Sequence, residues 1–218
     1  ACWRFPSSSA IWRGPAAKDF KGVSRSYFLL GIEHILGGID HLLFLTGLLI
    51  IAGTPRRTFV TVTGFTLAHS ATLALVALGL IVVSVPATEA VIALSIVFLA
   101  TEIARGDRTT LAWRRPVLVA SAFGLVHGAG FAAALGEIGL PKTETIAALL
   151  FFNLGVEAGQ IAVVIAAFSA LAVARRVRGA TSTVRAAPVA HATRVAGYAL
   201  GILSGYWFIE RLAALFSA

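Results

Sequence analysis

Residues 31–44 read Gly31-Ile-Glu33-His34-Ile-Leu-Gly37-Gly38-Ile-Asp40-His41-Leu-Leu-Phe44, which places two imidazoles and two carboxylates inside an otherwise apolar segment. The segment belongs to a hydrophobic run, residues 27–51, that exceeds the length of about 20 residues needed to cross a bilayer. Ionisable side chains at that depth are costly, and they usually serve a function. The stretch therefore predicts both a transmembrane helix and a polar site within it.

The composition of the whole chain is that of an integral membrane protein. Hydrophobic residues make up 58% of the 218 residues, charged residues make up 13%, and the mean hydropathy is +0.87. An ordinary soluble domain does not have this balance. The basic residues behind the formal charge of +8 lie mostly in the N-terminal tail and in short connections, where they can meet anionic lipid headgroups. The bilayer is therefore an expected partner and nucleic acid is not.

Six apolar runs of transmembrane length follow one another along the chain. They cover residues 27–51, 58–80, 86–104, 116–136, 145–174 and 192–216. Turn-forming and charged residues separate the runs. The sequence predicts an all-α membrane protein, in which residues 27–218 form one bundle of six transmembrane helices and residues 1–26 form an exposed tail. No internal repeat is evident.

The distribution of Lys and Arg predicts the orientation of the bundle. Arg residues concentrate in the connections after the first, third and fifth runs, whereas the connections after the second and fourth runs contain only Lys142. Short cytoplasmic loops collect basic residues, so the Arg-rich connections are expected in the cytoplasm. The chain is then a multi-pass protein of the bacterial inner membrane with both termini outside.

Helical geometry limits how His34 and His41 can cooperate. On a straight helix the two side chains project to nearly the same side but lie about 10.5 Å apart along the axis. One metal ion cannot bridge them there, because metal–nitrogen bonds are only about 2.0–2.1 Å long. Either Gly37-Gly38 breaks the helix, or the two histidines are successive stations of a path. The seven-residue spacing of the neighbouring carboxylates suits such a two-step path.

The other runs supply polar side chains at matching depths. The candidate metal ligands, which share an imidazole or carboxylate head group, are His34, Asp40, His41, His69, His127 and Glu157. A second set is expected to receive the ion from outside or to support the ligands, and it consists of Glu33, Glu89, Asn153 and Gln160. A single histidine within a membrane often does no more than form a hydrogen bond to a neighbouring helix. Several imidazole and carboxylate side chains that face one axis indicate a functional site.

The chemistry of these ligands selects a class of metal. Imidazole and carboxylate groups suit divalent Ni, Co, Zn or Fe, whereas Cu(I) prefers the sulfur of Cys and Met. The chain has no Met, and its single Cys2 lies in the tail. The expected ligand is therefore a divalent transition-metal ion.

The run His34-x5-Asp40-His41 resembles the H-x5-D-H signature of HupE/UreJ proteins. Together with residues 65–73, 123–131 and 152–160, it is similar to the second HupE/UreJ group, in which a variable outward-facing N-terminal region precedes the membrane core. The resemblance covers residues 27–216. It implies a nickel or cobalt permease associated with hydrogenase and urease maturation, and a metal-handling role for His34, Asp40 and His41.

The sequence leaves several functions open, and a permease is preferred. The chain contains no nucleotide-binding motif, so the energy for transport is expected from the membrane potential, an ion gradient or a separate subunit. The main alternative is a non-transporting accessory subunit of a larger membrane complex or homo-oligomer. A membrane-embedded hydrolase, with a metal that activates water, is a second alternative, and a haem bound by two histidines is a third. The preferred function is not enzymatic.

Overall fold

The computed structural model describes residues 20–138, 144–177 and 186–216, and every regular element in these ranges is a helix. The helices are α1 (Phe20–Gly37), α2 (Ile39–Ala52), α3 (Pro55–Ala77), α4 (Val85–Arg105), α5 (Leu111–Arg114), α6 (Pro116–Ile138), α7 (Thr145–Val177) and α8 (Ala186–Phe216). The prediction of an all-α protein is confirmed for these residues. Residues 20–26, which were expected in the tail, belong to α1; residues 1–19 lie outside the described residues.

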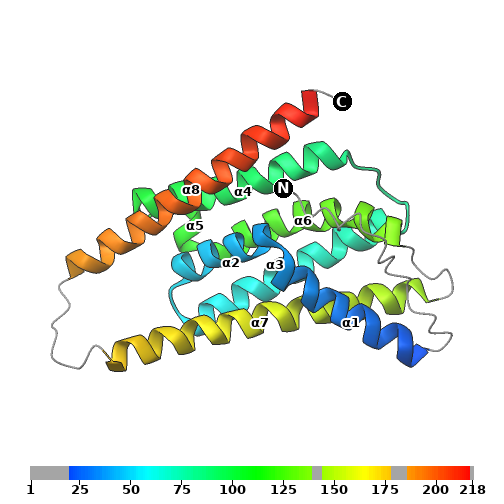
Figure 1. The fold of residues 1–218 in the computed structure, drawn as a ribbon, viewed down its shortest axis with the longest axis horizontal. Helices are drawn as coiled ribbons and strands as arrows, with labels where there is room; N and C mark the ends of the chain where they lie inside the picture. The colour runs from blue at the N-terminus through cyan, green and yellow to red at the C-terminus, as the bar shows by residue number, and fades with distance from the viewer. Residues whose placement is uncertain (1–19, 139–143, 178–185, 217–218) are drawn as a thin grey trace.

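The longer helices run roughly along the long axis of the molecule (Figure 1). Within the described residues, four helices are sufficiently long and apolar on their own, namely α3, α4, α7 and α8. The α1–α2 pair is apolar enough as one broken span, and α6 has a shorter apolar segment, Pro116–Ala132. The described chain thus contains four candidate spans, or five with the broken pair, where six were predicted.

The predicted first helix, residues 27–51, is two helices. Gly38 has an extended backbone, with φ −80° and ψ 101°, and α1 and α2 meet there at a bend of 71°. Each glycine weakens a helix by about 1 kcal/mol relative to alanine, so Gly37-Gly38 is the weakest point of the run. In Figure 1, α1 enters from one end of the bundle and reaches its middle, where α2 turns away. The run 27–51 is therefore broken at Gly38, which is one of the two arrangements that the sequence left open.

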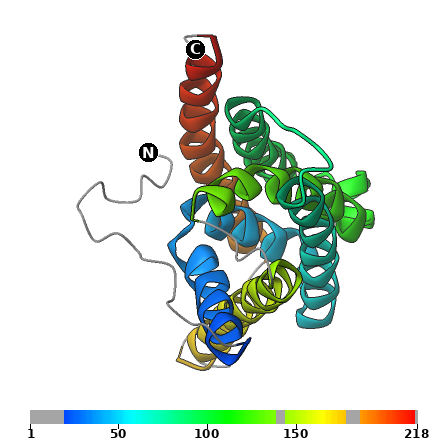
Figure 2. The same ribbon diagram turned by 90° about the vertical axis from the view of Figure 1, so that its right-hand side faces the viewer.

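Three helix pairs make the most extensive contacts: α1 with α7, α3 with α6, and α4 with α8. Figure 2, which shows most helices nearly end-on, places α1 and α7 together at one side of the bundle and α8 at the other. Glycine brings the first two pairs together, since a Cβ on Gly31 would collide with the carbonyl of Phe152, and one on Gly124 with the carbonyl of Phe65. Small residues allow this close approach of backbones in membranes.

The apolar core of the described residues has two main parts. One part joins α2, α3, α4 and α6 and includes Phe44, Leu48 and Leu99. The other joins α1, α3, α6 and α7 and includes Ile35 and Phe152. His127 contacts Phe44 of the first part, and His34 contacts Phe152 of the second.

Gly31→Ala is expected to destabilise the fold. The new Cβ would collide with the carbonyl of Phe152 and lie 2.8 Å from the backbone nitrogen of Val156, so α1 and α7 would have to separate. Overpacking of this kind costs roughly 1–3 kcal/mol, and thermal unfolding in detergent should show a lower melting temperature. Gly205→Ala is the matched control, because no atom lies within 4 Å of its added Cβ. If both variants melted at the same temperature, the close approach would not matter.

Candidate metal centre

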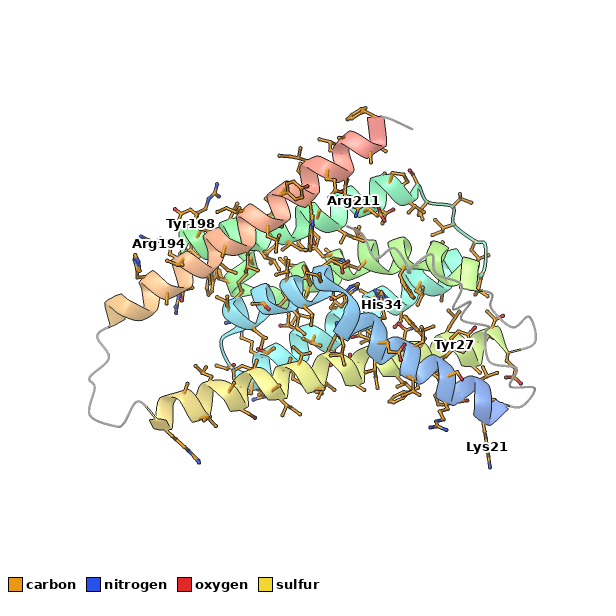
Figure 3. All side chains as sticks on the ribbon, in the orientation of Figure 1. Lys21, Tyr27, His34, Arg194, Tyr198 and Arg211 are labelled. Carbon is orange, nitrogen blue, oxygen red and sulfur yellow. The ribbon has the colours of Figure 1, made fainter. Side chains whose placement is uncertain are left out.

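Four histidines from four helices meet at the middle of the bundle. His34 on α1 and His41 on α2 have ring centroids 4.4 Å apart. The ring of His127 on α6 lies 5.4 Å from that of His41, and the ring of His69 on α3 lies 6.2 Å from that of His34 and 6.5 Å from that of His41. Figure 3 shows His34 near the inner end of α1, in the middle of the bundle. We call these four side chains the histidine cluster.

The helix break at Gly38 brings His34 and His41 together. On a straight helix they would be about 10.5 Å apart along the axis, whereas their rings are in contact. A Cβ at position 38 would lie 2.8 Å from His41 Nδ1 and 3.1 Å from Asp40 Oδ1, so only glycine leaves room for both side chains. Of the two arrangements that the sequence left open, the structure has the broken helix, and both histidines belong to one cluster.

Hydrogen bonds orient two of the imidazoles. His127 Nδ1 donates to the carbonyl oxygen of Phe123 over 2.9 Å. A carbonyl oxygen only accepts, so Nδ1 carries the proton and Nε2 keeps its lone pair. His41 Nδ1 contacts Asp40 Oδ1 at 3.1 Å and donates to this carboxylate in the same way. Metal-binding histidines are commonly oriented by such a bond, which leaves the other nitrogen free for the metal.

Five of the other six imidazole nitrogens are buried without a hydrogen-bond partner among the described residues. The buried, unpartnered atoms are Nε2 of His34, His41 and His127 and both ring nitrogens of His69. Leaving a buried polar atom without a hydrogen bond costs about 1–3 kcal/mol, and native structures contain few such atoms. Five of them in one place leave imidazole nitrogens available to a ligand that the protein itself does not supply.

The side chains as they stand do not converge on one point. Among the described residues, no three His, Cys, Asp or Glu side chains form a group that could hold a metal ion without rearrangement. Two nitrogens bound to one tetrahedral ion lie roughly 3.4 Å apart, so the rings would have to rotate towards each other. The cluster supplies suitable donors, and binding requires their reorientation.

The predicted carboxylate ligands are less central than the histidines. Asp40 lies in the first turn of α2, its side chain is 37% exposed, and it contacts His41. Glu157 on α7 accepts a hydrogen bond of 2.6 Å from Thr63 through Oε1, while its Oε2 is buried without a partner. Asp40 thus lies next to His41 on α2, and Glu157 is hydrogen-bonded to Thr63 of α3. Their role as metal ligands stays a prediction.

The residues expected to support the ligands are spread over three helices. Glu33 lies on the exposed face of α1, and Glu89 of α4 forms a 3.3 Å ion pair with Arg211 of α8, which is labelled in Figure 3. Asn153 donates over 2.8 Å to the carbonyl of Leu149 in its own helix. Gln160 accepts a 2.8 Å hydrogen bond from Thr66. Gln160 therefore links α7 to α3, the helix that carries His69.

Comparison with known proteins identifies the family. The profile of the HupE / UreJ protein family matches residues 15–211. The chain belongs to the HupE/UreJ family. No curated protein and no solved structure matches it. HupE/UreJ proteins are associated with nickel and cobalt transport rather than with enzymatic activity, and the apolar helices agree that this chain is an integral, multi-pass membrane protein.

In this HupE/UreJ protein the H-x5-D-H signature spans the helix break. Its first histidine, His34, lies in the last turn of α1, and Asp40 and His41 begin α2. The spacing of the signature is therefore explained by a bend that brings its two ends together, with the carboxylate oriented towards the second imidazole.

Sequence reasoning missed the aromatic rings that enclose the cluster of the HupE/UreJ protein. The ring of Phe131 lies 3.9 Å from that of His34, and the rings of Phe44 and Phe65 lie 5.0 and 5.2 Å from that of His127, between centroids. Phenylalanine in an apolar helix is indistinguishable by polarity from a lipid-facing or core residue. Only its position four residues after His127 singles out Phe131 as a neighbour on the same helix face.

Proposed function

We propose that this HupE/UreJ protein is a permease that carries a divalent transition-metal ion, of the nickel or cobalt class, through the histidine cluster. The observation that supports it most directly is the set of five buried, unpartnered imidazole nitrogens contributed by four helices. Imidazole is a good ligand for divalent Ni, Co, Zn and Fe. Transporter sites typically lie near the bilayer midplane, between helices that can move relative to each other.

The proposal includes six membrane crossings. The broken pair α1–α2 forms the first crossing, and α3, α4, α6, α7 and α8 form the others. The apolar segment of α6, Pro116–Ala132, is at the lower limit of about 17 residues for a span. The Arg-rich connections, including Arg56, Arg57 and residues 105–115, face the cytoplasm of a bacterium, and both termini lie outside.

The donor set suits an ion that must leave as well as enter. Neutral imidazoles bind a divalent ion without burying a fixed negative charge, and Asp40 is the carboxylate in contact with the cluster. The inside-negative membrane potential favours inward movement by about 2.3 kcal/mol per charge at 100 mV, hence about 4.6 kcal/mol for a divalent ion. This drives accumulation by roughly three orders of magnitude and requires no nucleotide-binding motif.

The test is transport by the purified protein in lipid vesicles. Ni²⁺ or Co²⁺ added outside should accumulate inside, and an inside-negative potassium diffusion potential should accelerate the accumulation. Vesicles without protein provide the background. Bound metal without accumulation would refute the permease and support the accessory subunit. If the protein neither bound nor accumulated Ni²⁺ or Co²⁺, any role of the cluster in handling nickel or cobalt would be refuted.

A further inference from the structure

In the α1–α7 pair, His34 lies in a defined aromatic unit. Gly31 of α1 packs on the backbone of Phe152 of α7. His34 follows Gly31 by three positions, and its ring centroid lies 5.5 Å from that of Phe152. The ring of Phe131, from α6, lies 3.9 Å from His34 and stacks on Phe152 at 4.9 Å with an interplanar angle of 8°. One imidazole thus lies against two rings that also contact each other.

The α3–α6 pair contains the same unit, with α6 in the place of α1 and α3 in the place of α7. Gly124 of α6 packs on the backbone of Phe65 of α3. His127 follows this glycine by three positions, and its ring centroid lies 5.2 Å from that of Phe65. The ring of Phe44, from α2, lies 5.0 Å from His127 and 5.3 Å from Phe65. Each contact of the first unit has a counterpart here.

The correspondence extends to whole helices. Exchanging α1–α2 with α6, α3 with α7, and α4 with α8 turns the α1–α7 contact into the α6–α3 contact and leaves the α4–α8 contact in place. These are the three most extensive helix contacts. With six crossings, the first and fourth spans run in opposite directions, so the exchange is a twofold rotation about an axis in the membrane plane, as in transporters built from inverted repeats.

The two units differ at the helix break. Phe44 follows His34 by ten positions, whereas Phe131 follows His127 by four. The six extra positions hold the bend at Gly38 and the pair Asp40–His41, whose imidazole lies between the two units, 4.4 Å from one histidine and 5.4 Å from the other. This explains why the sequence shows no obvious repeat, and why a single central histidine lies between two equivalent ones.

We propose that the chain consists of two inverted three-span halves around the histidine cluster, and that Phe131 and Phe44 are equivalent gates that close the cluster towards opposite faces of the membrane. This rests on the proposed permease function. Each gate lies against an imidazole that belongs to a different helix pair. Phe131, of the α3–α6 pair, covers His34 of the α1–α7 pair. Phe44, of α2, covers His127 of the α3–α6 pair. Movement between the pairs uncovers one imidazole at a time.

The position of each gate indicates the face that it closes. Phe131 stacks on Phe152 in the first third of α7, towards the end of the bundle where α1 begins, marked by Lys21 in Figure 3. Phe44 lies on α2, which leads to Arg56 and Arg57 at the opposite end. In the proposed orientation Phe131 is the outer gate and Phe44 is the cytoplasmic gate. The face of an aromatic ring attracts a cation, so a displaced gate also lines the route of the metal.

The test compares access of Co²⁺ to the cluster from the two sides. Radioactive Co²⁺ is added alone to right-side-out and inside-out membrane vesicles, and its initial rate of binding to the protein is measured after rapid purification. Removing one aromatic contact, as in Phe131→Ala, should accelerate binding from the outer face by roughly two- to tenfold. Phe44→Ala should accelerate binding from the cytoplasmic face by a similar factor. Neither variant should change the rate from its opposite face.

The control is Phe98→Ala, because the ring of Phe98 packs on Phe123 at 5.6 Å, away from the histidine rings; it should change neither rate. Phe44 is only 2% exposed, so Phe44→Leu, which fills more of the core, replaces Phe44→Ala if that variant does not fold. Equal effects from both faces, or no effect with binding intact, would overturn the gates but not the permease. No Co²⁺ binding by the unchanged protein from either face would overturn both.

Discussion

His41→Ala should remove nearly all metal bound to the purified protein. The ring of His41 contacts those of His34, His69 and His127, so it is the member of the cluster that joins the others. Its Nε2 is buried without a partner, and water at this depth cannot take the place of a lost ligand. Loss of a supporting residue alone typically reduces metal affinity 10- to 100-fold. We therefore expect a decrease of more than about 100-fold in titrations with Ni²⁺.

A matched histidine outside the cluster provides the control. His191 lies exposed at the start of the apolar part of α8, and His191→Ala should bind Ni²⁺ like the unchanged protein. Asp40→Asn should have an intermediate effect, because Asp40 acts through the hydrogen bond that orients His41 and an amide oxygen can still accept it. If His41→Ala and His191→Ala bound Ni²⁺ with equal affinity while both proteins were folded, the histidine cluster would not be the Ni²⁺ site.

The lengths of the apolar runs predicted most helices to within a few residues. The run predicted at 86–104 is α4, Val85–Arg105, and the run predicted at 58–80 is α3, Pro55–Ala77. Bilayer thickness imposes these lengths, so they can be read without tertiary information. The bend between α1 and α2 could not be read in this way. Adjacent glycines in an apolar run are equally compatible with close packing of a straight helix, and only the packing of α1 on α7 and of α2 on α4 distinguishes the two.

For the candidate site, the sequence predicts how deep a side chain lies in the membrane better than it predicts the face of the helix from which the side chain projects. His69 and His127 each lie near the centre of an apolar run, and the structure does bring them together with His34 and His41. Glu157 is at a similar depth, but its hydrogen bond is to Thr63 rather than to an imidazole. Position along a helix follows from counting residues, whereas the face it presents to a neighbour depends on how the helices are rotated in the bundle. The aromatic gates depend entirely on that rotation.

Gly38→Ala should weaken metal binding although residue 38 offers no ligand of its own. An added Cβ would lie 2.7 Å from the carbonyl oxygen of His34 and 2.8 Å from His41 Nδ1. Alanine also favours a continuous helix by about 1 kcal/mol, and straightening would return the two histidines to about 10.5 Å along the axis. Both effects separate His34 from His41, so Ni²⁺ affinity should decrease by roughly tenfold or more.

The experiment must separate this effect from general loss of stability. Gly201→Ala in α8 is a suitable control, because its added Cβ would meet Ala100 Cβ at an ordinary distance of 3.5 Å. Melting temperature and Ni²⁺ affinity are measured for both variants in the same detergent. We expect Gly38→Ala to lose affinity at a temperature where both proteins are folded, and Gly201→Ala to keep it. Should Gly38→Ala bind Ni²⁺ as tightly as Gly201→Ala, the break would be a feature of packing alone, and the spacing of the H-x5-D-H signature would need another explanation.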